Sequence, residues 1–429
     1  MEKYIVTGGR KLSGTVEISG MKNSAVAILF GTILCKDVCT IRNVPQIQDV
    51  MLSLEILRSM GVSVKMLGRD TVQIDTTNIN SDLVPYDLVR KMRASYYILG
   101  AELGRCGRAY TGFPGGCDFG VRPIDQHIKG FEALGATVNV EGGYIEASYG
   151  NGGKSKGASV YLDVISVGAT INIMLASVCT TGVTVIENAA KEPHVVDTAN
   201  FLNSCGAYIT GAGTDVIKIK GVERLHGCNY AIIPDMIEAG TYMAMAAATG
   251  STITVNNVIP KHLESITAKL EEMGVGIEEL DEAIIVRGPE KLNKANVKTQ
   301  PYPGFPTDMQ PQICVLQCLA EGLSILSENV WDNRFRYVDE LRKMSAKIKV
   351  EGKTAMIEGP VKLTAAKVSA VDLRAGAAMI VAALAANGTT EIDNIYSIQR
   401  GYEDIEEKLR ALGADFKYIF EPDPVEIAE

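Results

Sequence analysis

One cysteine stands at the tip of a glycine-rich loop, where a thiol could act as an acid or as a nucleophile. The loop reads Pro114-Gly115-Gly116-Cys117, and Arg122 follows five residues later. A nearby guanidinium and the N-terminus of a following helix would lower the pKa of the thiol and could hold an anion. The alternative is an incidental surface thiol. The residues favour proton transfer or covalent chemistry at Cys117, with an anionic ligand close by.

Cations recur where predicted strands give way to helices. Lys22 precedes an apolar helix that begins at Asn23, and Arg93 and Arg374 occupy comparable places further along the chain. Free N–H groups and the dipole at a helix N-terminus attract anions, and a Lys or Arg there adds charge. Any one of them could be a solvated cation, but several at equivalent positions predict a phosphate or carboxylate site. Arg400 by itself would be an ordinary surface arginine.

Other helix starts of the same kind carry aspartate or small polar residues. Asp308 opens one predicted helix, Asp372 lies two residues before Arg374 at another, and Ser166 to Gly168 open a third. Aspartate is also a preferred N-cap residue, because its side chain accepts the free N–H groups of the first turn. The chemistry of the two aspartates therefore stays open on this pattern alone.

These junctions belong to a supersecondary unit that recurs six times, about every seventy residues. A helix ending of the form Leu-x-x-Met/Leu-Gly-Ala/Val places its glycine, or one serine, at Gly61, Gly135, Gly206, Gly274, Ser345 and Gly413. The intervals are 74, 71, 68, 71 and 68 residues. Self-similarity of this regularity predicts a stack or ring of one repeated unit.

Each repeat is predicted to run strand, helix, strand, helix, strand, strand. In the first repeat these elements are Thr15–Ser19, Asn23–Cys35, Cys39–Asn43, Gln48–Met60, Ser63–Met66 and Thr71–Asp75. The first strands of the later repeats are predicted at Tyr86–Val89, Ser159–Val164, Tyr230–Asp235, Val297–Pro301 and Lys367–Asp372. The first helices are apolar on nearly every face, so we expect them to be buried.

The second repeat departs from the pattern at the cysteine loop. In the other five, an asparagine marks the exit of the second strand, at Asn43, Asn188, Asn257, Asn329 and Asn394. From there to the helix-end residue the chain takes 16 to 19 residues, whereas 23 residues separate Gly112 from Gly135 in the second repeat. The excess lies in the segment that carries Cys117, and lengthened loops often carry function.

The N-terminus offers the strand that the sixth repeat lacks. The motif Gly-x-x-x-Leu follows the last strand of three repeats, at Gly221–Leu225, Gly288–Leu292 and Gly359–Leu363. It also occurs at Gly8–Leu12, directly after Tyr4–Thr7. We therefore predict that the first strand completes the last repeat. Three repeats per domain then give one domain of residues 21–230 and a second of 1–20 plus 231–429, with a ligand cleft between them.

The composition limits the class of protein. The chain has 429 residues, 46% hydrophobic and 22% charged, which is ordinary for a globular protein. Its net charge of −9 argues against a nucleic-acid or anionic-membrane surface. The longest apolar runs fall short of the ~20 residues that span a bilayer, and Met1–Gly9 has no signal-peptide pattern. We expect a cytoplasmic protein.

The sequence shows no pattern for a metal or a cofactor. None of the nine cysteines forms a CxxC pair, and the four histidines lack metal-ligand spacing. Cys35 and Cys39 are expected to be small buried side chains in a reducing compartment. The chain also has no Gly-x-Gly-x-x-Gly motif and no P-loop, so we expect no nicotinamide, flavin or ATP cofactor.

Several motifs together match a known family. They are Lys22-Asn23, Pro114 to Cys117, Arg122 to His127, Ser166 to Thr170, Phe305 to Asp308, Asp372 to Ala375 and Arg400 to Tyr402. Over essentially all its residues the chain resembles the UDP-N-acetylglucosamine 1-carboxyvinyltransferases, which are enolpyruvyl transferases. The resemblance implies an α/β fold of two domains, an inside-out α/β barrel of six βαβαββ units with three in each domain.

The resemblance also implies a reaction. Enolpyruvate would pass from phosphoenolpyruvate to the 3′-hydroxyl of UDP-N-acetylglucosamine, releasing phosphate through a tetrahedral intermediate, in the first committed step of peptidoglycan synthesis. Cys117 would be the general acid and would form a covalent adduct with phosphoenolpyruvate, while Asp308 would take the hydroxyl proton. The phosphate and carboxylate would be neutralised by Lys22, Arg122, Arg374 and Arg400.

The same resemblance implies a binding site for the sugar nucleotide. Its residues would be Lys22, Asn23, Arg93, Arg122, Pro123, Ile124, Asp125, Gln126, Ser166, Val167, Gly168, Asp308, Val330 and Arg374. Closure of the domains, with the Cys117 loop as a lid, would exclude water. The chain departs from many members at Val164, where a Lys is common, and at Tyr97 and Trp331, where other aromatics stand.

Two alternatives remain beside this interpretation. The sister enolpyruvyl transferases that act on shikimate 3-phosphate share the fold but lack the Pro-Gly-Gly-Cys loop, so Cys117 argues against them. A non-catalytic repeat toroid, such as a sliding clamp, needs basic helices around its pore. This chain is acidic and has its suggestive cations at helix starts.

Overall fold

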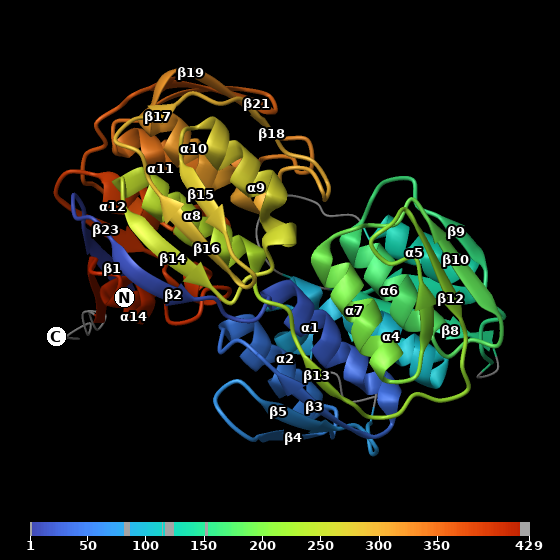
Figure 1. The fold of residues 1–429 in the computed structure, drawn as a ribbon. Coiled ribbons are helices and arrows are strands. Elements are labelled where there is room, and N and C mark those ends of the chain that lie inside the picture. Colours follow the sequence, from blue (N-terminus) through green and yellow to red (C-terminus); the bar gives the residue numbers. More distant parts are fainter. Residues whose placement is uncertain (1, 81–85, 114, 116–123, 151–152, 421–429) are drawn as a thin grey trace, which may run out of the picture. The chain divides into compact units, whose positions relative to one another are not determined.

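The computed structural model describes residues 2–80, 86–113, 115, 124–150 and 153–420 (Figure 1). The chain folds into two compact parts. The terminal domain combines Met1–Ser19 with Pro234–Glu429, and the central domain is Gly20–Ile233. Both are mixed α/β structures. None of the helices in the described ranges has the length and apolarity needed to cross a bilayer.

Three sheets of the terminal domain lie within the described residues. The first has the order β22 (Lys367–Ser369), β23 (Thr389–Asp393), β1 (Glu2–Thr7), β24 (Asp415–Phe420). The second has the order β15 (Gly276–Glu279), β16 (Ala283–Arg287), β14 (Thr252–Asn256), β2 (Ser13–Glu17). The third has the order β17 (Leu292–Asn293), β19 (Ala320–Ser327), β21 (Thr354–Gly359), β20 (Lys347–Glu351), and β18 (Val297–Lys298) also pairs with β19.

The described part of the central domain also holds three sheets. One has the order β13 (Asn229–Ala231), β3 (Val38–Arg42), β5 (Val72–Asp75), β4 (Ser63–Met66). Another has the order β11 (Tyr208–Thr210), β12 (Val216–Lys220), β10 (Val183–Glu187), β9 (Ser159–Tyr161). The last has three strands, β6 (Arg108–Gly112), β8 (Tyr144–Tyr149) and β7 (Ala136–Glu141).

Five of these six sheets share one pairing pattern. An outer strand runs parallel to its neighbour, and the remaining pairs are antiparallel, except that both β17 and β18 run parallel to β19 in the third sheet of the terminal domain. The three-stranded sheet has no parallel strand among the described residues. The strand expected at Tyr86–Val89 is instead a short helix, α3. That prediction was wrong. The segment follows Pro85 in the sequence and has Asp87 in its first turn, two features that favour a helix start.

The strands that precede the first helices of repeats one and four do not join the sheets of the repeats to which the sequence assigned them. Each of the two strands pairs in the sheet of the other repeat. β2, assigned to the first repeat, pairs in parallel with β14, and Thr15 lies opposite Thr254. β13, assigned to the fourth repeat, pairs in parallel with β3, and Tyr230 lies opposite Ile41. The chain leaves each domain directly after one of these strands. Each strand therefore completes a sheet of the domain that the chain is leaving.

The N-terminal strand lies where the repeats predict it. β1 pairs antiparallel with β23 on one side and with β24 on the other. Tyr4 stands opposite Ile392 in one ladder and Tyr418 in the other. The prediction that the first strand completes the sixth repeat is confirmed.

Both domains contain helices as well as sheets. In the central domain they are α1 (Lys22–Gly31), α2 (Gln48–Ser59), α3, α4 (Tyr97–Cys106), α5 (Asp125–Ala133), α6 (Val167–Ser177) and α7 (Pro193–Ser204), with the short 3₁₀ helices η1 (Thr32–Cys35) and η3 (Arg93–Tyr96). In the terminal domain they are α8 (Met236–Thr249), α9 (Pro260–Glu272), α10 (Gln310–Leu319), α11 (Val338–Lys343), α12 (Leu373–Ala385), α13 (Tyr396–Gln399) and α14 (Ile405–Ala411), with η5 (Thr307–Met309) and η6 (Arg334–Tyr337).

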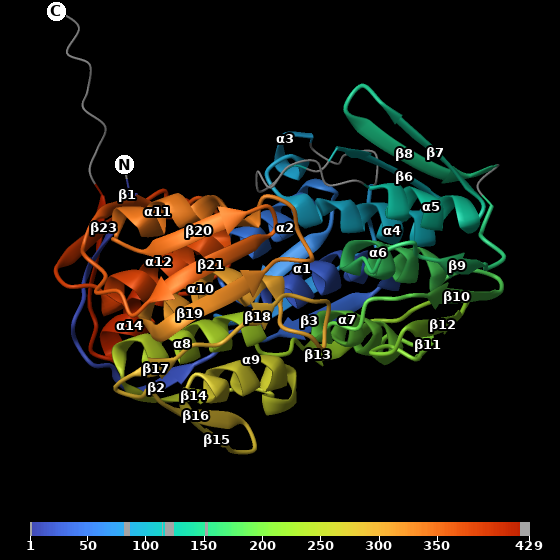
Figure 2. The same cartoon turned by 90° about the horizontal axis from the view of Figure 1, so that it is seen from above.

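The first helix of each repeat is buried, as its composition predicts. In the terminal domain α8, α10 and α12 contact one another, and Figures 1 and 2 show that domain's sheets outside them. In the central domain α4 packs on α6 with no side chain at Gly100, where a Cβ would lie 2.4 Å from the backbone oxygen of Asn172. Burial of these apolar helices supplies the core of each domain.

The repeat markers have a common backbone role. The helix-end residues Gly61, Gly135, Gly206, Gly274, Ser345 and Gly413 all have positive φ, from 75° to 96°, as a helix C-cap requires. The strand-exit asparagines use their side-chain N–H groups to hold the end of the neighbouring parallel strand. The pairs are Asn43 with Ile232 O, Asn188 with Leu162 O, Asn257 with Ile18 O, Asn329 with Thr299 O and Asn394 with Ala370 O.

Candidate active site

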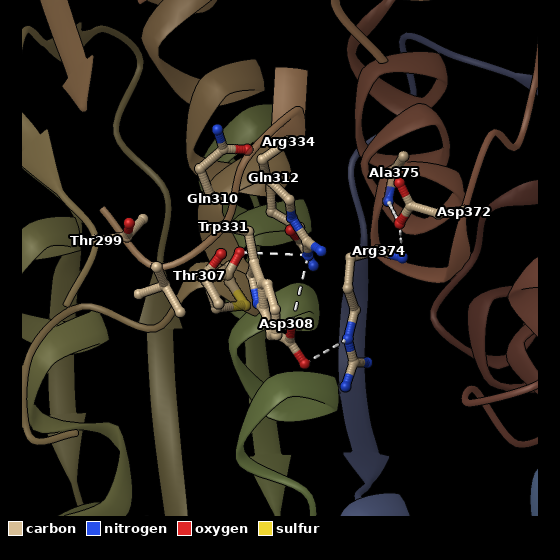
Figure 3. A network of polar contacts seen from close by, with 12 residues as sticks. Thr299, Thr307, Asp308, Gln310, Gln312, Trp331, Arg334, Asp372, Arg374 and Ala375 are labelled. Carbon is tan, nitrogen blue, oxygen red and sulfur yellow. Dashed lines mark hydrogen bonds and ion pairs between the residues drawn. The ribbon is translucent and has the colours of Figure 1, made fainter. Parts of the chain in front are cut away.

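The terminal domain contains a carboxylate that is held by two arginines (Figure 3). Asp308 lies in η5, and its Oδ2 accepts a hydrogen bond from Nε of Arg374 at 3.1 Å. Its Oδ1 faces Nη2 of Arg334 at 3.5 Å. The two arginine side chains are only 4% and 3% exposed, whereas that of Asp308 is 30% exposed. The carboxylate is therefore accessible while its cationic partners are fixed inside the domain.

The two aspartates that the sequence left open have different roles. Oδ1 of Asp372 accepts hydrogen bonds from the backbone N–H groups of Arg374 (2.8 Å) and Ala375 (3.0 Å), so Asp372 is the N-cap of α12. Asp308 lies inside η5, whose N-cap residue is Pro306, and the N-cap residue of α10 is Met309. The N-cap interpretation is thus confirmed for Asp372 and wrong for Asp308. Asp372 fixes the start of the helix that presents Arg374.

Arg374 keeps its charge in a buried place. Burial acts to lower the pKa of its guanidinium, but Asp308, Tyr402 and Asp235 together outweigh that effect and raise the pKa. Its Cζ lies 5.6 Å from the ring centroid of Tyr402, within cation–π distance. Nη1 is buried and has no hydrogen-bond partner among the described residues. That N–H group can serve an anionic ligand.

A buried glutamate, Glu328, organises the chain around Asp308. Its Oε2 accepts a hydrogen bond from Thr307 Oγ1 at 3.0 Å. Its Oε1 accepts from Thr299 Oγ1 (2.9 Å) and from the backbone N–H groups of Val330 (2.8 Å) and Trp331 (3.0 Å). One carboxylate therefore fixes both the segment before Asp308 and the segment that contains Val330.

In the central domain, Lys22 is the first residue of α1 and is already paired. Its Nζ lies 2.9 Å from Oδ2 of Asp49, which belongs to the first turn of α2. Asp49 is 6% exposed and Lys22 is 14% exposed. Two residues further along, Ser24 donates a hydrogen bond to the buried carboxylate of Asp197. The start of α1 is therefore a fixed polar junction, with Asn23 half-buried between these contacts.

Arg93 lies against an aromatic pair in the same domain. Its Cζ is 5.8 Å from the ring centroid of Tyr96, and the ring of His127 is 4.7 Å from that of Tyr96. Burial, and then the charge of Arg93, lower the pKa of His127 to about 3. Its Nδ1 lies 2.9 Å from Nδ2 of Asn172, so the neutral imidazole accepts that hydrogen bond. A Cβ on Gly168 would lie 2.6 Å from the Tyr96 hydroxyl oxygen, so α6 begins close to this cluster.

The start of α5 joins the same cluster. Ile124 is the N-cap residue of α5, Asp125 is exposed, and Gln126 is buried. Gln126 Nε2 donates to Asp125 (3.0 Å) and to Asp163 (3.1 Å), while its Oε1 accepts from the backbone N–H of Asp163 at 2.9 Å. Ser166 caps α6 by accepting a hydrogen bond from the backbone N–H of Ala169. The structure therefore gathers Arg93, Ile124 to Gln126 and Ser166 to Gly168.

Comparison with known proteins shows to which family this chain belongs. The model of the EPSP synthase (3-phosphoshikimate 1-carboxyvinyltransferase) family matches residues 6–409. "UDP-N-acetylglucosamine 1-carboxyvinyltransferase 3" of Caldanaerobacter subterraneus subsp. tengcongensis is 56% identical over 421 residues, covering 98% of this chain and all of that protein. "UDP-N-acetylglucosamine 1-carboxyvinyltransferase" of Clostridium botulinum is also 56% identical, covering 96% of this chain and 99% of that protein. This chain belongs to the UDP-N-acetylglucosamine 1-carboxyvinyltransferase family.

Solved structures agree with that family. The enolpyruvyl transferase NikO from Streptomyces tendae superposes with a TM-score of 0.88 at 25% identity, over 98% of this chain and 99% of that one. An EPSP synthase from Acinetobacter baumannii gives a TM-score of 0.75 at 19% identity, over 98% and 100% of the two chains, and shows a common fold. The family resemblance inferred from the sequence is confirmed.

Some residues that the family motifs point to cannot be located. Cys117, Arg122 and Pro123 lie outside the described residues. Arg400 directly follows α13 and is half-buried. Val164, where many family members have a Lys, is exposed on the chain just before α6.

Three residues that hold the candidate site were not singled out from the sequence. They are Arg334, Glu328 and Asp49. Asp49 carried the clearest signal, because an aspartate in the first turn of a helix is favoured by the dipole. Glu328 directly precedes the strand-exit Asn329, but the preceding residues in other repeats are not uniformly acidic. Arg334 had no sequence signal of its own.

Proposed function

We propose that this protein is a transferase that moves enolpyruvate from phosphoenolpyruvate to the 3′-hydroxyl of UDP-N-acetylglucosamine and releases phosphate. In a cell this is the first committed step of peptidoglycan synthesis. The observation that carries the proposal is the 56% identity, over nearly the full chain, to proteins named for this reaction. The accessible Asp308, held by Arg374 and Arg334, supports it chemically.

The detailed architecture of the fold is also part of the proposal. We interpret the chain as six βαβαββ units, three per domain, in an inside-out α/β barrel whose helices lie inside. The shared pairing pattern of five sheets and the burial of the first helices support this. The expected domains, 21–230 and 1–20 plus 231–429, stay part of the proposal, as does a site to which both contribute.

The terminal domain supplies the base in this proposal. Addition of the sugar hydroxyl to phosphoenolpyruvate requires a group that takes the hydroxyl proton as the new C–O bond forms. Asp308 offers an accessible carboxylate oxygen, and the fixed charges of Arg374 and Arg334 keep that carboxylate oriented. Arg374 also offers its buried Nη1–H to the phosphate or carboxylate of phosphoenolpyruvate, where charge changes during the reaction. Arg400 is proposed to act beside it.

Cys117 is proposed as the acid that protonates the methylene carbon and as the site of a covalent phosphoenolpyruvate adduct. The support is its loop sequence and its neighbour Arg122, because a thiol of near-neutral pKa can deliver a proton at pH 7. Lys22 is proposed to neutralise the phosphate. Its pairing with Asp49 fixes the ammonium group at the start of α1.

The sugar nucleotide is assigned to the cluster around Arg93. Arg93, Gln126 and Ser166 bring a cation, an amide and a helix N-terminus together, groups that suit a diphosphate and its neighbouring hydroxyls. Asn23, Arg122 to Asp125, Val167 and Gly168 complete this proposed surface, and Val330 is its contribution from the terminal domain. No cofactor or metal takes part in the proposed reaction. The proposed location is the cytoplasm.

The acceptor decides between this function and its nearest alternative. Phosphate release should be measured with phosphoenolpyruvate and either UDP-N-acetylglucosamine or shikimate 3-phosphate. We expect release with the sugar nucleotide and none above background with shikimate 3-phosphate. The reverse result would assign the protein to the 3-phosphoshikimate 1-carboxyvinyltransferases, whose family model also matches the chain.

A further inference from the structure

Four cysteines of the central domain, each from a different element, bring their sulfur atoms together. Cys35 ends η1, Cys39 lies in β3, Cys205 directly follows α7 and Cys228 directly precedes β13. Figure 1 labels β3, α7 and β13. The Sγ atoms of Cys35, Cys39 and Cys205 all lie within 4.8 Å of one another. Sγ of Cys228 lies 3.3 Å from Sγ of Cys205. The Cys39 thiol is in hydrogen-bonding contact with all three of the others.

These distances suit a single tetrahedral metal ion. A Zn–S bond of about 2.3 Å places the four sulfur atoms of a tetrahedral site about 3.8 Å apart. The sulfur atoms of Cys35, Cys39 and Cys205 lie within 4.8 Å of one another, and that of Cys228 lies 3.3 Å from that of Cys205, so small side-chain adjustments would bring the four to this spacing. A site made only of four sulfur ligands is diagnostic of zinc or iron. A cubane iron–sulfur cluster would hold its cysteine sulfurs further apart than these are, which favours one ion.

The backbone holds two of the four cysteines, Cys39 and Cys228, close together independently of their side chains. β3 and β13 are parallel neighbours, and the N–H of Thr40 donates to the carbonyl of Cys228 at 2.8 Å. Gly227 permits this approach, because a Cβ there would lie 1.9 Å from the carbonyl oxygen of Val38. A preformed ligand geometry lowers the entropic cost of binding an ion.

The surroundings suit thiolate ligands. Cys35, Cys39 and Cys205 are fully buried, while Cys228 is half-buried and leaves a route for an ion. Arg105 donates to the backbone carbonyl of Ile33 at 2.6 Å, and its positive charge is felt at Cys35. That charge would offset part of the excess negative charge of four thiolates around a divalent ion.

A second cysteine pair shows what ordinary buried thiols look like in this protein. Cys314 and Cys318 lie one turn apart on α10, both fully buried, in the same spacing as Cys35 and Cys39. Among the described residues, only the group around Cys35 meets the geometric requirements for three or more metal ligands. The convergence of Cys205 and Cys228 on Cys35 and Cys39 therefore goes beyond what packing alone explains.

We propose that Cys35, Cys39, Cys205 and Cys228 bind one Zn²⁺ ion as thiolates and that this ion is structural. Four S–H bonds are replaced by four Zn–S bonds, and the four protons pass to solvent. All four positions of the ion are then filled by protein, so it has no open position for a substrate. The ion links the first repeat of the central domain to the third. This site is separate from the proposed reaction, and its test does not measure turnover.

The direct test is the metal content of the full chain. The protein should be purified under reducing conditions without chelator and without added metal, then measured by inductively coupled plasma and native mass spectrometry. We expect close to one zinc per chain. Cys228→Ser should lose at least nine-tenths of it, whereas the matched variant Cys318→Ser in the terminal domain should keep it. Wild-type protein that stays metal-free after incubation with Zn²⁺, or that contains a Cys205–Cys228 disulfide in peptide maps, overturns the proposal.

A spectroscopic measurement on the wild type avoids any dependence on the folding of variants. Protein stripped of metal with a chelator is titrated with Co²⁺, which reports its ligands by colour. We expect one equivalent to produce intense thiolate charge-transfer bands and the d–d bands of tetrahedral cobalt, both removed by one equivalent of Zn²⁺. A weak octahedral spectrum contradicts the proposal. So does a tetrahedral spectrum that survives in Cys228→Ser.

Discussion

Two helix starts, one in each domain, carry a buried or nearly buried cation with an aspartate partner, but the partners differ. Arg374, at the start of α12, pairs with Asp308 from η5, which stays 30% exposed. Lys22, at the start of α1, pairs with Asp49 of α2, which is 6% exposed. An accessible carboxylate can meet a substrate hydroxyl, and a buried one can only hold its cation. The same repeat position thus supports chemistry in one place and positioning in the other.

The largest effect is expected from an isosteric substitution of Asp308, the accessible one of the two aspartates. Asp308→Asn removes the proposed base while keeping its shape, and general-base catalysis contributes roughly 10²–10⁴-fold, so kcat should fall by about that factor. The measurement is phosphate release under saturating substrates. Asp339→Asn, which alters an exposed ion pair with Arg342, is the control and should leave kcat unchanged. A kcat for Asp308→Asn within threefold of wild type contradicts the assignment of the base.

Arg374→Lys should produce the next largest effect. Lysine keeps the charge but loses the planar donor group that reaches Asp308 through Nε and offers Nη1. A hydrogen bond to a charged group is worth about 1.5–3 kcal/mol, so kcat/KM for phosphoenolpyruvate should fall about 10- to 100-fold. Steady-state kinetics with Arg342→Lys as the matched surface control would check this. Equal values for both variants would mean that charge alone suffices at Arg374.

Arg93 lies near the neutral imidazole of His127, whereas Arg374 pairs with a charged carboxylate. The pH dependence of the unfolding free energy should show that His127 is neutral in the folded protein. Native His127, with its pKa lowered to about 3 from 6.5, stays neutral while the unfolded side chain takes up a proton below pH 6.5. This one residue should therefore lower the free energy of unfolding by about 1.4 kcal/mol per pH unit as pH falls from 6.5 toward 3. Urea denaturation at pH 7 and pH 5 measures it.

The control for this prediction is His127→Gln, which cannot take up a proton. The difference in unfolding free energy between pH 7 and pH 5 should be smaller in this variant by about 2 kcal/mol. An identical pH dependence in both proteins would mean that native His127 is protonated like the unfolded side chain.

The smallest effect is expected at the buried aspartate. Asp49→Asn keeps an acceptor oxygen near Nζ of Lys22 and changes only the charge of a residue that is 6% exposed. We expect a change in kcat/KM of less than about tenfold, because a single hydrogen bond is kept and only its charge assistance is lost. Side-by-side kinetics with Asp308→Asn measure the contrast. A loss at Asp49 as large as that at Asp308 would remove the distinction between the two junctions.

The sequence predicts the repeated scaffold well, because its signals are local. Helix-end glycines with positive φ and the strand-exit asparagines are set by backbone geometry that neighbouring residues determine. The exchange of β2 and β13 was not foreseen, since strand pairing depends on where the chain crosses between domains. Tyr86–Val89 was predicted as a strand by analogy with the other repeats, and its own residues favoured the helix.

The candidate site was predictable only in its chemical types. Asp308 and Arg374 stand out as polar residues at helix starts, but their contact joins residues 66 positions apart, and Arg334 gave no signal. The cysteines show the same limit more sharply. Cys35 and Cys39 were interpreted as small buried side chains, because nothing local connects them with Cys205 and Cys228. Only the fold brings the four sulfur atoms together.

Identification of the reaction product tests the central claim most directly. The protein is incubated with phosphoenolpyruvate labelled with ¹³C in its three carbons and with unlabelled UDP-N-acetylglucosamine, and the products are examined by NMR and mass spectrometry. The proposed function predicts a labelled enolpyruvyl ether on the sugar 3′-oxygen, with one phosphate released for each ether formed. Labelled pyruvate with an unchanged sugar nucleotide, or an ether at another hydroxyl, would contradict it.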